Sequence, residues 1–281
     1  MQFKSLEILF KSESRSKQYL VQKCWEKNKR FCIRCQSRKI YRLGEKRYRC
    51  ARCRYTFQDF SGRWIGKLNL SAKRWLWILK LFELEITTRR IAGEVEISYP
   101  TALKATHLIR CSIIQASDNG DIFREREWSE ACFGRQRSGR RIRKDRESPP
   151  VFGVLEREGK VRISIVEDVK PATLLAENVR AAKTGSIVYT DRWRNLDALM
   201  FYAHRHLNAD RAKRMAGTSV YLDSREGFWS FARERLLKFH GVSQQHFPLY
   251  LKEMEFRYNH RRQELYEILA NAITRLVPNV L

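Results

Sequence analysis

The chain has 281 residues, enough to bury a sizeable core and to hold one to three domains. It carries 56 Lys plus Arg against 31 Asp plus Glu, a formal net charge of +25 that is spread along the chain rather than confined to a tail. Such a charge favours a polyanionic partner, of which nucleic acid is the commonest, although a merely soluble basic protein has the same composition.

The apolar content argues against two classes of protein. With 43% hydrophobic residues and seven tryptophans, the chain has enough apolar surface to fold, which argues against general disorder. It has no run of eighteen apolar residues, and charges flank the short apolar patch near the amino terminus, so neither a membrane span nor a secretory signal is expected. We therefore expect a cytoplasmic protein with no membrane partner.

Residues 1–66 form a small basic module, with 18 Lys plus Arg and 5 Asp plus Glu. The module contains "CIRC" and "CARC", and this C-x2-C-x14-C-x2-C pattern predicts a tetrahedral structural zinc site with Zn–S bonds near ~2.3 Å. A structural zinc supplies on the order of 10 kcal/mol of folding free energy to a module too small to have its own core. Four buried cysteines without metal, or a redox pair, are the alternatives. The predicted ligands are Cys32, Cys35, Cys50 and Cys53.

Residues 67–117 are predicted to form a helix-turn-helix domain of three helices. Apolar residues recur there at spacings of three and four, and breaks fall at "EIT" and "EISYP". Ser98 is placed to cap the last helix, and Pro100 falls in its first turn, where the missing N–H costs nothing. A plain three-helix bundle with a solvated basic face explains the same letters.

Five basic residues of this segment are candidates for DNA contact. Arg89 and Arg90 are expected to face phosphates. Lys104, His107 and Arg110, at spacings of three, are expected to lie along one helix face that reaches base edges or the DNA backbone.

Residues 118–281 are predicted to form an α/β domain on a mixed sheet, because strands come first and then alternate with helices. The expected order is a strand "DIFREREWS", a hairpin that turns at Gly159, a helix near 171–183, a strand "SIVYTD", a helix from about 193, and two longer helices after 224 and 244. The connection 134–150 has seven basic residues against two acidic ones, and we expect it to bind phosphate through residues that include Arg140, Arg141 and Arg143.

Carboxylates in this domain are candidate metal ligands. Asp191 ends an apolar strand, where a fixed carboxylate beside an open loop can bind a hard cation, although it could instead cap the following helix. Asp223 and Glu226 are three residues apart at the start of a helix and hence on one face. Acids at a helix start are also common because they complement the helix dipole.

Taken in order, these pieces resemble the bacterial insertion-sequence transposases that carry a zinc ribbon, a helix-turn-helix and a DDE-type domain of the ribonuclease H-like fold. The most specific letters are "VFGVLEREGKVRISIVED", "VYTDRW", "EGFWSFARERL" and "HFPLYLKEMEFRYNHR". The resemblance implies a nucleoid-associated enzyme that binds the element's terminal inverted repeats and target DNA, at least as a dimer. It further implies phosphodiester hydrolysis at the element's end and attack of the freed 3′-hydroxyl on target DNA.

The resemblance also implies roles for individual residues. Asp191 matches the family's second carboxylate, Asp223 its third position and Glu226 the glutamate that follows. Arg233 stands where the family often has lysine, so a cation near the scissile phosphate is kept. The implied cofactors are Mg²⁺ or Mn²⁺ held principally by Asp191 and Asp223, beside the structural zinc.

The family's first carboxylate is replaced by Ser129 in "SEACFG". Serine is a neutral and poor magnesium ligand, so this change predicts impaired catalysis. Glu127 shares the strand face but starts roughly 6–7 Å back, and Glu130 is adjacent but should point to the opposite face. The resemblance thus predicts a transposase. The rivals are a catalytically inactive, transposase-derived DNA-binding protein and an RNA-processing nuclease of the same fold.

Overall fold

The protein is described here from a computed structural model. The structure describes residues 3–116, 151–157, 160–166, 187–192, 195–202, 205–208, 228–236, 238, 242 and 246–278. The chain divides into two compact units. Unit 1 comprises Met1–Ala116 together with Arg262–Leu281, and unit 2 comprises Ser117–Arg261.

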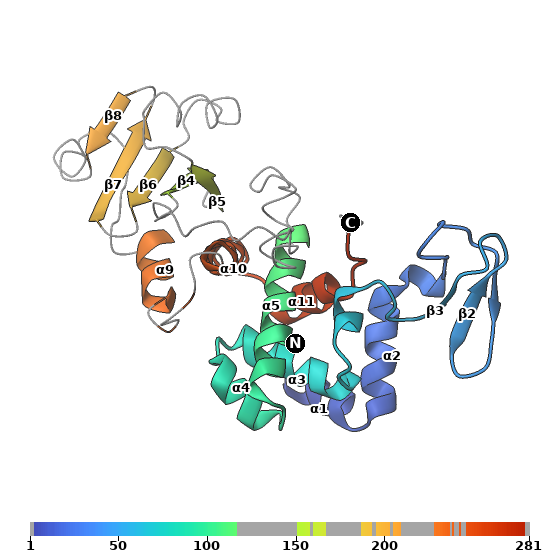
Figure 1. The fold of residues 1–281 in the computed structure, drawn as a ribbon. Helices are drawn as coiled ribbons and strands as arrows, with labels where there is room; N and C mark the ends of the chain where they lie inside the picture. The colour runs from blue at the N-terminus through green and yellow to red at the C-terminus, as the bar shows by residue number, and fades with distance from the viewer. Residues whose placement is uncertain are drawn as a thin grey trace, which may run out of the picture. The chain divides into compact units, whose positions relative to one another are not determined.

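The unit boundaries differ from the expected domains in two respects. The predicted zinc module and the predicted three helices belong to one unit, and the last twenty residues, expected in the catalytic domain, return to that same unit. The cause of the return is apolar: helix α11 (Leu265–Ile273) buries Tyr266, Leu269 and Ile273 and packs against α3, α5 and α2. Figure 1 shows α11 beside α5.

Unit 1 has a helical core in which Leu76, Leu79, Ile91, Ile109 and Leu269 are completely buried. The three helices expected between residues 70 and 116 are present, so this expectation is confirmed. The helices of unit 1 are α1 (Phe3–Phe10), α2 (Glu13–Cys24), α3 (Ala72–Glu83), α4 (Thr88–Glu94), α5 (Tyr99–Ala116) and α11, with short 3-10 turns at Glu26–Asn28 and Trp64–Lys67.

Left-handed residues end α3 and α4. Glu85 has φ 59° and Glu96 has φ 54°, and the amide of Ile97 then donates to the carbonyl of Ala92 at 3.0 Å. This is the geometry in which a helix closes its last turn, usually on a glycine. At the start of α5, the Ser98 hydroxyl accepts from the amide of Thr101 at 3.4 Å, as the sequence predicts.

Residues 29–61, called the ribbon from here on, contain a three-stranded antiparallel sheet in the order β1-β2-β3. Its inner face buries Tyr48 and Phe57 against Trp25, which stands just after α2. The sheet is therefore fixed on the helices by one aromatic cluster. The strands are β1 (Ile40–Arg42), β2 (Arg47–Cys50) and β3 (Thr56–Gln58).

Unit 2 contains a five-stranded sheet in the order β5-β4-β6-β7-β8. The predicted hairpin is confirmed, since β4 and β5 pair from Val151↔Val166 to Arg157↔Lys160. Two helices begin close to the predicted points. The elements are β4 (Val151–Arg157), β5 (Lys160–Val166), β6 (Ile187–Arg192), β7 (Asn195–Tyr202), β8 (Arg205–Asn208), α9 (Phe228–Leu236) and α10 (Phe247–Asn259).

Two expectations about this sheet differ from the structure. Every strand pair among the described residues is antiparallel, so no mixed sheet is seen there. The helix expected from about residue 193 is wrong: Asn195–Tyr202 is strand β7, paired with β6 through Val188↔Phe201. A short apolar run has no decisive period, and the neighbouring strand decides its state. The expected strand "DIFREREWS" and the helix near 171–183 lie outside the described residues.

Helix α10 packs against β5, and one side chain fixes the two together. The Asn259 amide accepts from the Val161 N–H and donates to the Val161 carbonyl, both at 2.7 Å. Asn259 thus occupies the place of a strand partner at an edge of the sheet. No helix in the described part of the chain is long and apolar enough to cross a membrane.

Candidate zinc centre and nucleic-acid-binding module

Four cysteine sulfurs converge in the ribbon. The Sγ atoms of the four predicted ligands all lie within 4.8 Å of one another. The Cys32–Cys53 and Cys35–Cys50 sulfur pairs are 3.5 and 3.6 Å apart. A tetrahedral zinc with Zn–S bonds of ~2.3 Å requires S–S edges of roughly 3.8 Å. The donor set and its spacing therefore fit Zn²⁺.

Each cysteine pair belongs to a tight turn of the same design. The amide of Gln36 donates to the Cys32 carbonyl at 2.8 Å, and the amide of Arg54 donates to the Cys50 carbonyl at 3.1 Å. Both residues have positive φ, 57° for Gln36 and 60° for Arg54. The spacing C-x2-C is thus what lets two thiols of one turn point to one centre.

Backbone amides favour the thiolate that a metal needs. The amide of Cys53 donates toward the Cys50 sulfur at 3.4 Å, and the amide of Arg52 does so at 3.3 Å. Led by the Cys53 amide, these bonds lower the pKa of Cys50 to about 6. Burial raises the pKa of Cys24 to about 12, and this cysteine is not one of the four whose sulfurs converge.

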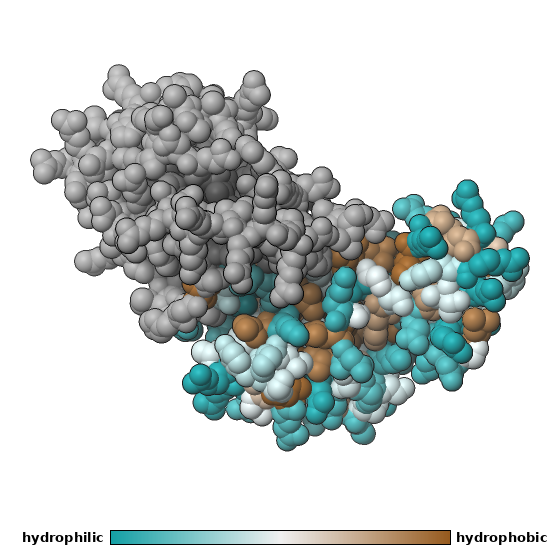
Figure 2. Space-filling model, in the orientation of Figure 1, coloured by the Kyte–Doolittle hydropathy of each residue, from teal (hydrophilic) through white to brown (hydrophobic). Residues whose placement is uncertain are grey.

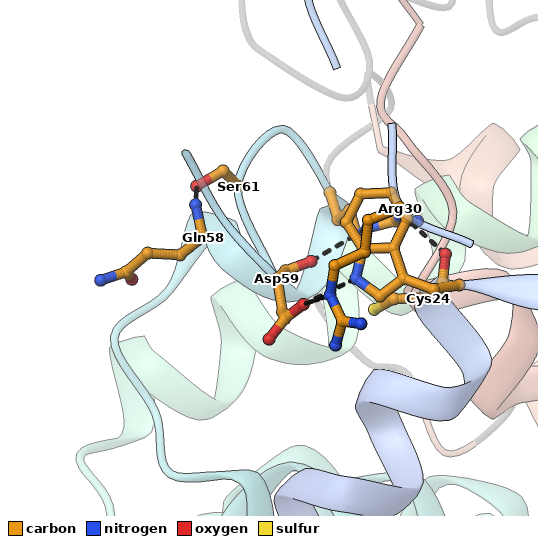
Figure 3. Close-up of polar contacts among 7 residues, drawn as sticks. Cys24, Arg30, Gln58, Asp59 and Ser61 are labelled. Carbon is orange, nitrogen blue, oxygen red and sulfur yellow. Dashed lines mark hydrogen bonds and ion pairs between the residues drawn. The ribbon is translucent and has the colours of Figure 1, made fainter. Parts of the chain in front are cut away.

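A buried polar network joins the ribbon to the helices. The Asp59 carboxylate, 7% exposed, accepts from the Trp25 indole at 2.8 Å and from Arg30 Nε at 2.9 Å (Figure 3). Nearby, the Ser61 hydroxyl accepts from the Gln58 amide at 2.9 Å and closes the turn after β3. The network was not predicted, because no spacing in the sequence marks it.

Arg63 is the centre of this network. Its guanidinium lies over the Trp25 ring, 4.4 Å from the centroid, and is 4% exposed. It donates to the backbone carbonyls of Asp59, Cys24 and Thr274, at 3.2, 2.7 and 2.5 Å. These carbonyls come from the ribbon, from α2 and from the residue after α11. Arg63 therefore holds three distant segments at one point.

The expected DNA-contacting residues of the helices divide into two groups. Arg89 and Arg90 are exposed on α4, where Arg90 also pairs with Glu94 at 3.4 Å, and Lys104 is exposed on α5. Arg110 is 3% exposed and lies over the Phe82 ring, so it does not share the surface of Lys104.

The placement of Arg110 has a simple geometric cause. Three residues turn an α-helix by about 300°, so positions at spacings of three drift by about 60° each. Arg110 is therefore about 120° from Lys104, and His107 lies between them, half-buried. The exposed surface at the start of α5 instead carries Tyr99 and Leu103, 49% and 39% exposed, which the sequence interpretation missed.

Only part of the predicted catalytic set is described. Asp191 lies in β6 opposite Phe152, at a register shift between Thr190 and Arg192. Such irregularities occur preferentially at sheet edges and beside active sites. Arg233 lies in α9. The other candidates lie outside the described residues: Glu127, Ser129, Glu130, Asp223, Glu226 and the loop residues Arg140, Arg141 and Arg143.

Comparison with known proteins identifies the family. The ISXO2-like transposase domain matches residues 125–259, and the transposase zinc-ribbon domain matches residues 11–56. An "Uncharacterized transposase-like protein" of Haemophilus influenzae (strain ATCC 51907 / DSM 11121 / KW20 / Rd) is 38% identical over 100 residues, 36% of this chain and 81% of that protein. The chain belongs to the ISXO2-like transposase family. No solved structure matches this transposase.

The family matches agree with the described geometry of the ribbon. The zinc-ribbon match ends at residue 56, after the last of the four converging cysteines. The transposase-domain match begins at residue 125 and ends at Asn259, the residue that fixes α10 to the sheet. The expected family is therefore confirmed, with a DDE-type transposase domain and a ribbon that suggests structural zinc.

Proposed function

We propose that this protein is the DNA transposase of an insertion sequence. It binds the element's terminal inverted repeats and, with divalent metal, cleaves DNA at the element's end and transfers the strand to target DNA. The observation that carries the proposal is the transposase-domain match over residues 125–259, because this range contains Ser129, Asp191, Asp223 and Glu226.

The proposed chemistry has two displacements at phosphorus. First, a water oxygen bonds to the phosphorus at the element's end, and the P–O bond to the 3′-oxygen breaks, leaving a 3′-hydroxyl. That hydroxyl then bonds to a target phosphorus, and the target strand's own 3′-oxygen leaves. Bound Mg²⁺ or Mn²⁺ supplies activation of the attacking oxygen and stabilisation of the leaving oxygen.

Side chains of this chain would bind the metal and neutralise the charge of the scissile phosphate. Asp191 and Asp223 would hold the metal through hard oxygen ligands, with Glu226 as an auxiliary. Arg233 would neutralise charge on the scissile phosphate. The β6 strand supports this assignment, since Asp191 pairs with Phe152 of β4 and its two neighbours, Thr190 and Arg192, pair with β7.

A second function is favoured by one residue. Ser129 stands at the family's first carboxylate position, and a serine hydroxyl gives no negative charge to a metal. A chain with this change would keep DNA binding and lose cutting unless Glu127 or Glu130 substitutes. The second candidate is accordingly a catalytically inactive, transposase-derived DNA-binding protein.

A cleavage assay separates the two candidates. The wild type, Asp191→Ala and Ser129→Asp are incubated with duplex carrying the element's own end, with Mg²⁺ or Mn²⁺, and nicks and strand-transfer products are counted. Asp197→Ala, which removes another carboxylate of the same sheet but outside the motif, is the matched control. We expect Asp191→Ala to abolish products that Asp197→Ala retains.

The Ser129→Asp result decides between the candidates. If the wild type cuts, the site works without the missing aspartate, and Glu127→Gln and Glu130→Gln identify the substitute. If the wild type is inert and Ser129→Asp cuts, the chain is a DNA-binding protein silenced by one substitution. If neither cuts DNA that the protein binds, the catalytic proposal is wrong.

We propose that α4 and α5 supply sequence recognition as a helix-turn-helix. Residues 95–98 form the four-residue connection that such a motif needs, and α4 packs on α5. Arg89 and Arg90 would contact phosphates, and Lys104 and His107 would approach base edges. Because two ends must meet before transfer, at least two copies of the chain would assemble on DNA.

A further inference from the structure

The outer face of the ribbon sheet carries an ordered set of side chains. Side chains of a strand alternate between faces, so the register places Tyr41, Arg49 and Thr56 in one row across β1, β2 and β3. Arg47 and Gln58 form the next row on the same face. Tyr41 is 59% exposed, and the other four residues are exposed as well.

The orientation of this face is fixed from behind. Tyr48 and Phe57 on the opposite face are 9% and 2% exposed and pack in the cluster around Trp25. Cys50, at the end of β2, is one of the four converging cysteines and pairs with Ile40 of β1. A one-residue slip would bury Arg49 and expose Phe57, so the sheet presents Arg49 to solvent in a single register.

The charge of the ribbon is strongly one-sided. Residues 29–54 contain eleven Lys or Arg and a single acidic residue, Glu45. Glu45 pairs with Arg47 at 3.3 Å. Arg49 has no carboxylate within ion-pair distance among the residues that the structure describes. Figure 2, in the orientation of Figure 1, shows the ribbon covered largely by hydrophilic residues.

We propose that this outer sheet face is a DNA-reading surface, with Arg49 at its centre and Tyr41 and Arg47 beside it. The inference rests on the proposed function and deepens it, because it names the sheet face and the side chains with which the ribbon reads duplex DNA. The partner is the major groove of duplex DNA, which admits a two-stranded β-ribbon, here β1 and β2, the strands that carry Tyr41, Arg47 and Arg49. Arg49 contacts a guanine edge or a phosphate, both of which a guanidinium bonds in bidentate fashion.

The spacing on the strand suits a duplex. Arg47 and Arg49 are two residues apart on one face, roughly 6.6 Å at ~3.3 Å per residue. Base pairs follow each other at ~3.4 Å along the strand, so the two arginines match alternate steps. Duplex RNA does not fit, because its major groove is too narrow for side chains to read.

The test compares two arginines that differ in face. Arg49→Ala removes the central side chain, whereas Arg42→Ala removes an exposed arginine of β1 whose row contains the inward-facing Tyr48. Tyr41→Ala is the third variant. Each full-length, zinc-loaded variant is titrated against duplex carrying the element's terminal repeat, at several salt concentrations. Zinc content of one ion per chain verifies that the ribbon has folded.

The expected result is specific to the face. Arg49→Ala weakens duplex binding about tenfold or more, and if the contact is to phosphate it lowers the salt slope by about 0.9. Tyr41→Ala weakens binding less, and Arg42→Ala leaves both quantities unchanged. If Arg49→Ala binds the duplex like the wild type, or if Arg42→Ala is equally damaging, the inference is wrong although the proposed function stands.

Two further outcomes concern other partners. If Arg49→Ala changes binding of a single-stranded RNA probe but not of the duplex, the face binds RNA and the inference is overturned. If the wild type itself does not bind the terminal repeat at any salt concentration, the proposed function fails first, and that failure is visible before any variant is compared.

Discussion

The ribbon and the helical part of unit 1 reach stability by different routes. In the helical part, Leu76, Leu79, Ile91 and Ile109 are completely buried, so an apolar core accounts for the packing. The ribbon has three short strands, and its small core is one aromatic cluster that also includes Cys32 and Cys50, two of the four converging cysteines. A module of that size needs a metal where a larger one needs only burial.

The difference determines what each part can present to DNA. The helical part buries its apolar residues in the core, and its exposed Lys and Arg side chains are spaced by the helix period. Few residues of the ribbon are buried, so most positions on the outer face of its sheet can carry a polar or basic side chain. A structural zinc at the four cysteines would allow this small segment to carry a dense positive charge and stay folded.

Zinc removal should have the largest effect, and it should act on the ribbon alone. Chelation should unfold residues 32–58, because the ion supplies on the order of 10 kcal/mol to them, and should leave α3, α4 and α5 protected. Hydrogen exchange measured by mass spectrometry, with zinc quantified per chain, follows both parts at once. Loss of protection throughout the helices would show that they too depend on the metal.

Single cysteine variants separate metal loss from thiol loss. Cys50→Ser should release the zinc and unfold the ribbon, whereas Cys24→Ser, another buried cysteine, should retain one zinc per chain. Equal zinc loss in both variants would contradict the four-cysteine assignment.

Truncating a buried leucine should destabilise the helical part without affecting zinc binding. Leu269 of α11 is completely buried, and Leu269→Ala should destabilise the helical part by about 3 kcal/mol through lost burial and a residual cavity. Urea denaturation monitored by hydrogen exchange in α3 and α5 measures the effect, with zinc content unchanged. Leu103→Ala, which truncates a leucine that is 39% exposed, should change stability little. Equal effects of the two variants would show that α11 is not part of this core.

The sequence predicts the ribbon well because residues close together in the sequence determine its turns. Each CxxC segment predicts a tight turn with two thiols on one side, and the four cysteines converge as expected. The helices were also predictable, since Ser98 and the breaks at Glu85 and Glu96 are local signals. The return of α11 to unit 1 could not be predicted, because the apolar pattern of α11 does not say which unit the helix packs against, and only long-range packing decides this.

The candidate sites show the same division. Arg110 and Lys104 look alike in the sequence, and only the helix rotation and the Phe82 ring separate a buried arginine from an exposed lysine. The structural role of Arg63 was missed because its hydrogen-bond partners are backbone carbonyls, which every residue has and which the sequence therefore does not mark. The proposed catalytic positions run from Ser129 to Glu226, and among them only Asp223 and Glu226 are joined by a local spacing.

Arg63 tests whether the two parts are coupled. Arg63→Met keeps an unbranched apolar stem and removes the guanidinium, so three buried carbonyls lose their donor at a cost of about 2 kcal/mol. We expect the wild type to unfold in urea in one transition, and Arg63→Met to unfold with separate midpoints for the ribbon and the helices. Arg52→Met, an exposed arginine of the second cysteine turn, should leave the single transition intact. Coincident transitions in Arg63→Met would place the coupling in the aromatic cluster instead.

The smallest expected effect concerns the turn between α4 and α5. Glu96 has φ 54°, a conformation that costs a side-chain-bearing residue roughly 1–2 kcal/mol, and glycine removes this cost while adding backbone entropy to the unfolded chain. Glu96→Gly should therefore stabilise the helical part by about 0.5 kcal/mol. Glu94→Gly, two residues earlier at the right-handed end of α4, should destabilise it by about 0.5–1 kcal/mol. Both variants remove one negative charge, and Glu94→Gly also removes the exposed ion pair with Arg90, which contributes little at the surface. Opposite signs in urea denaturation would therefore point to the backbone conformation as the main cause, and equal signs would assign the effect to charge.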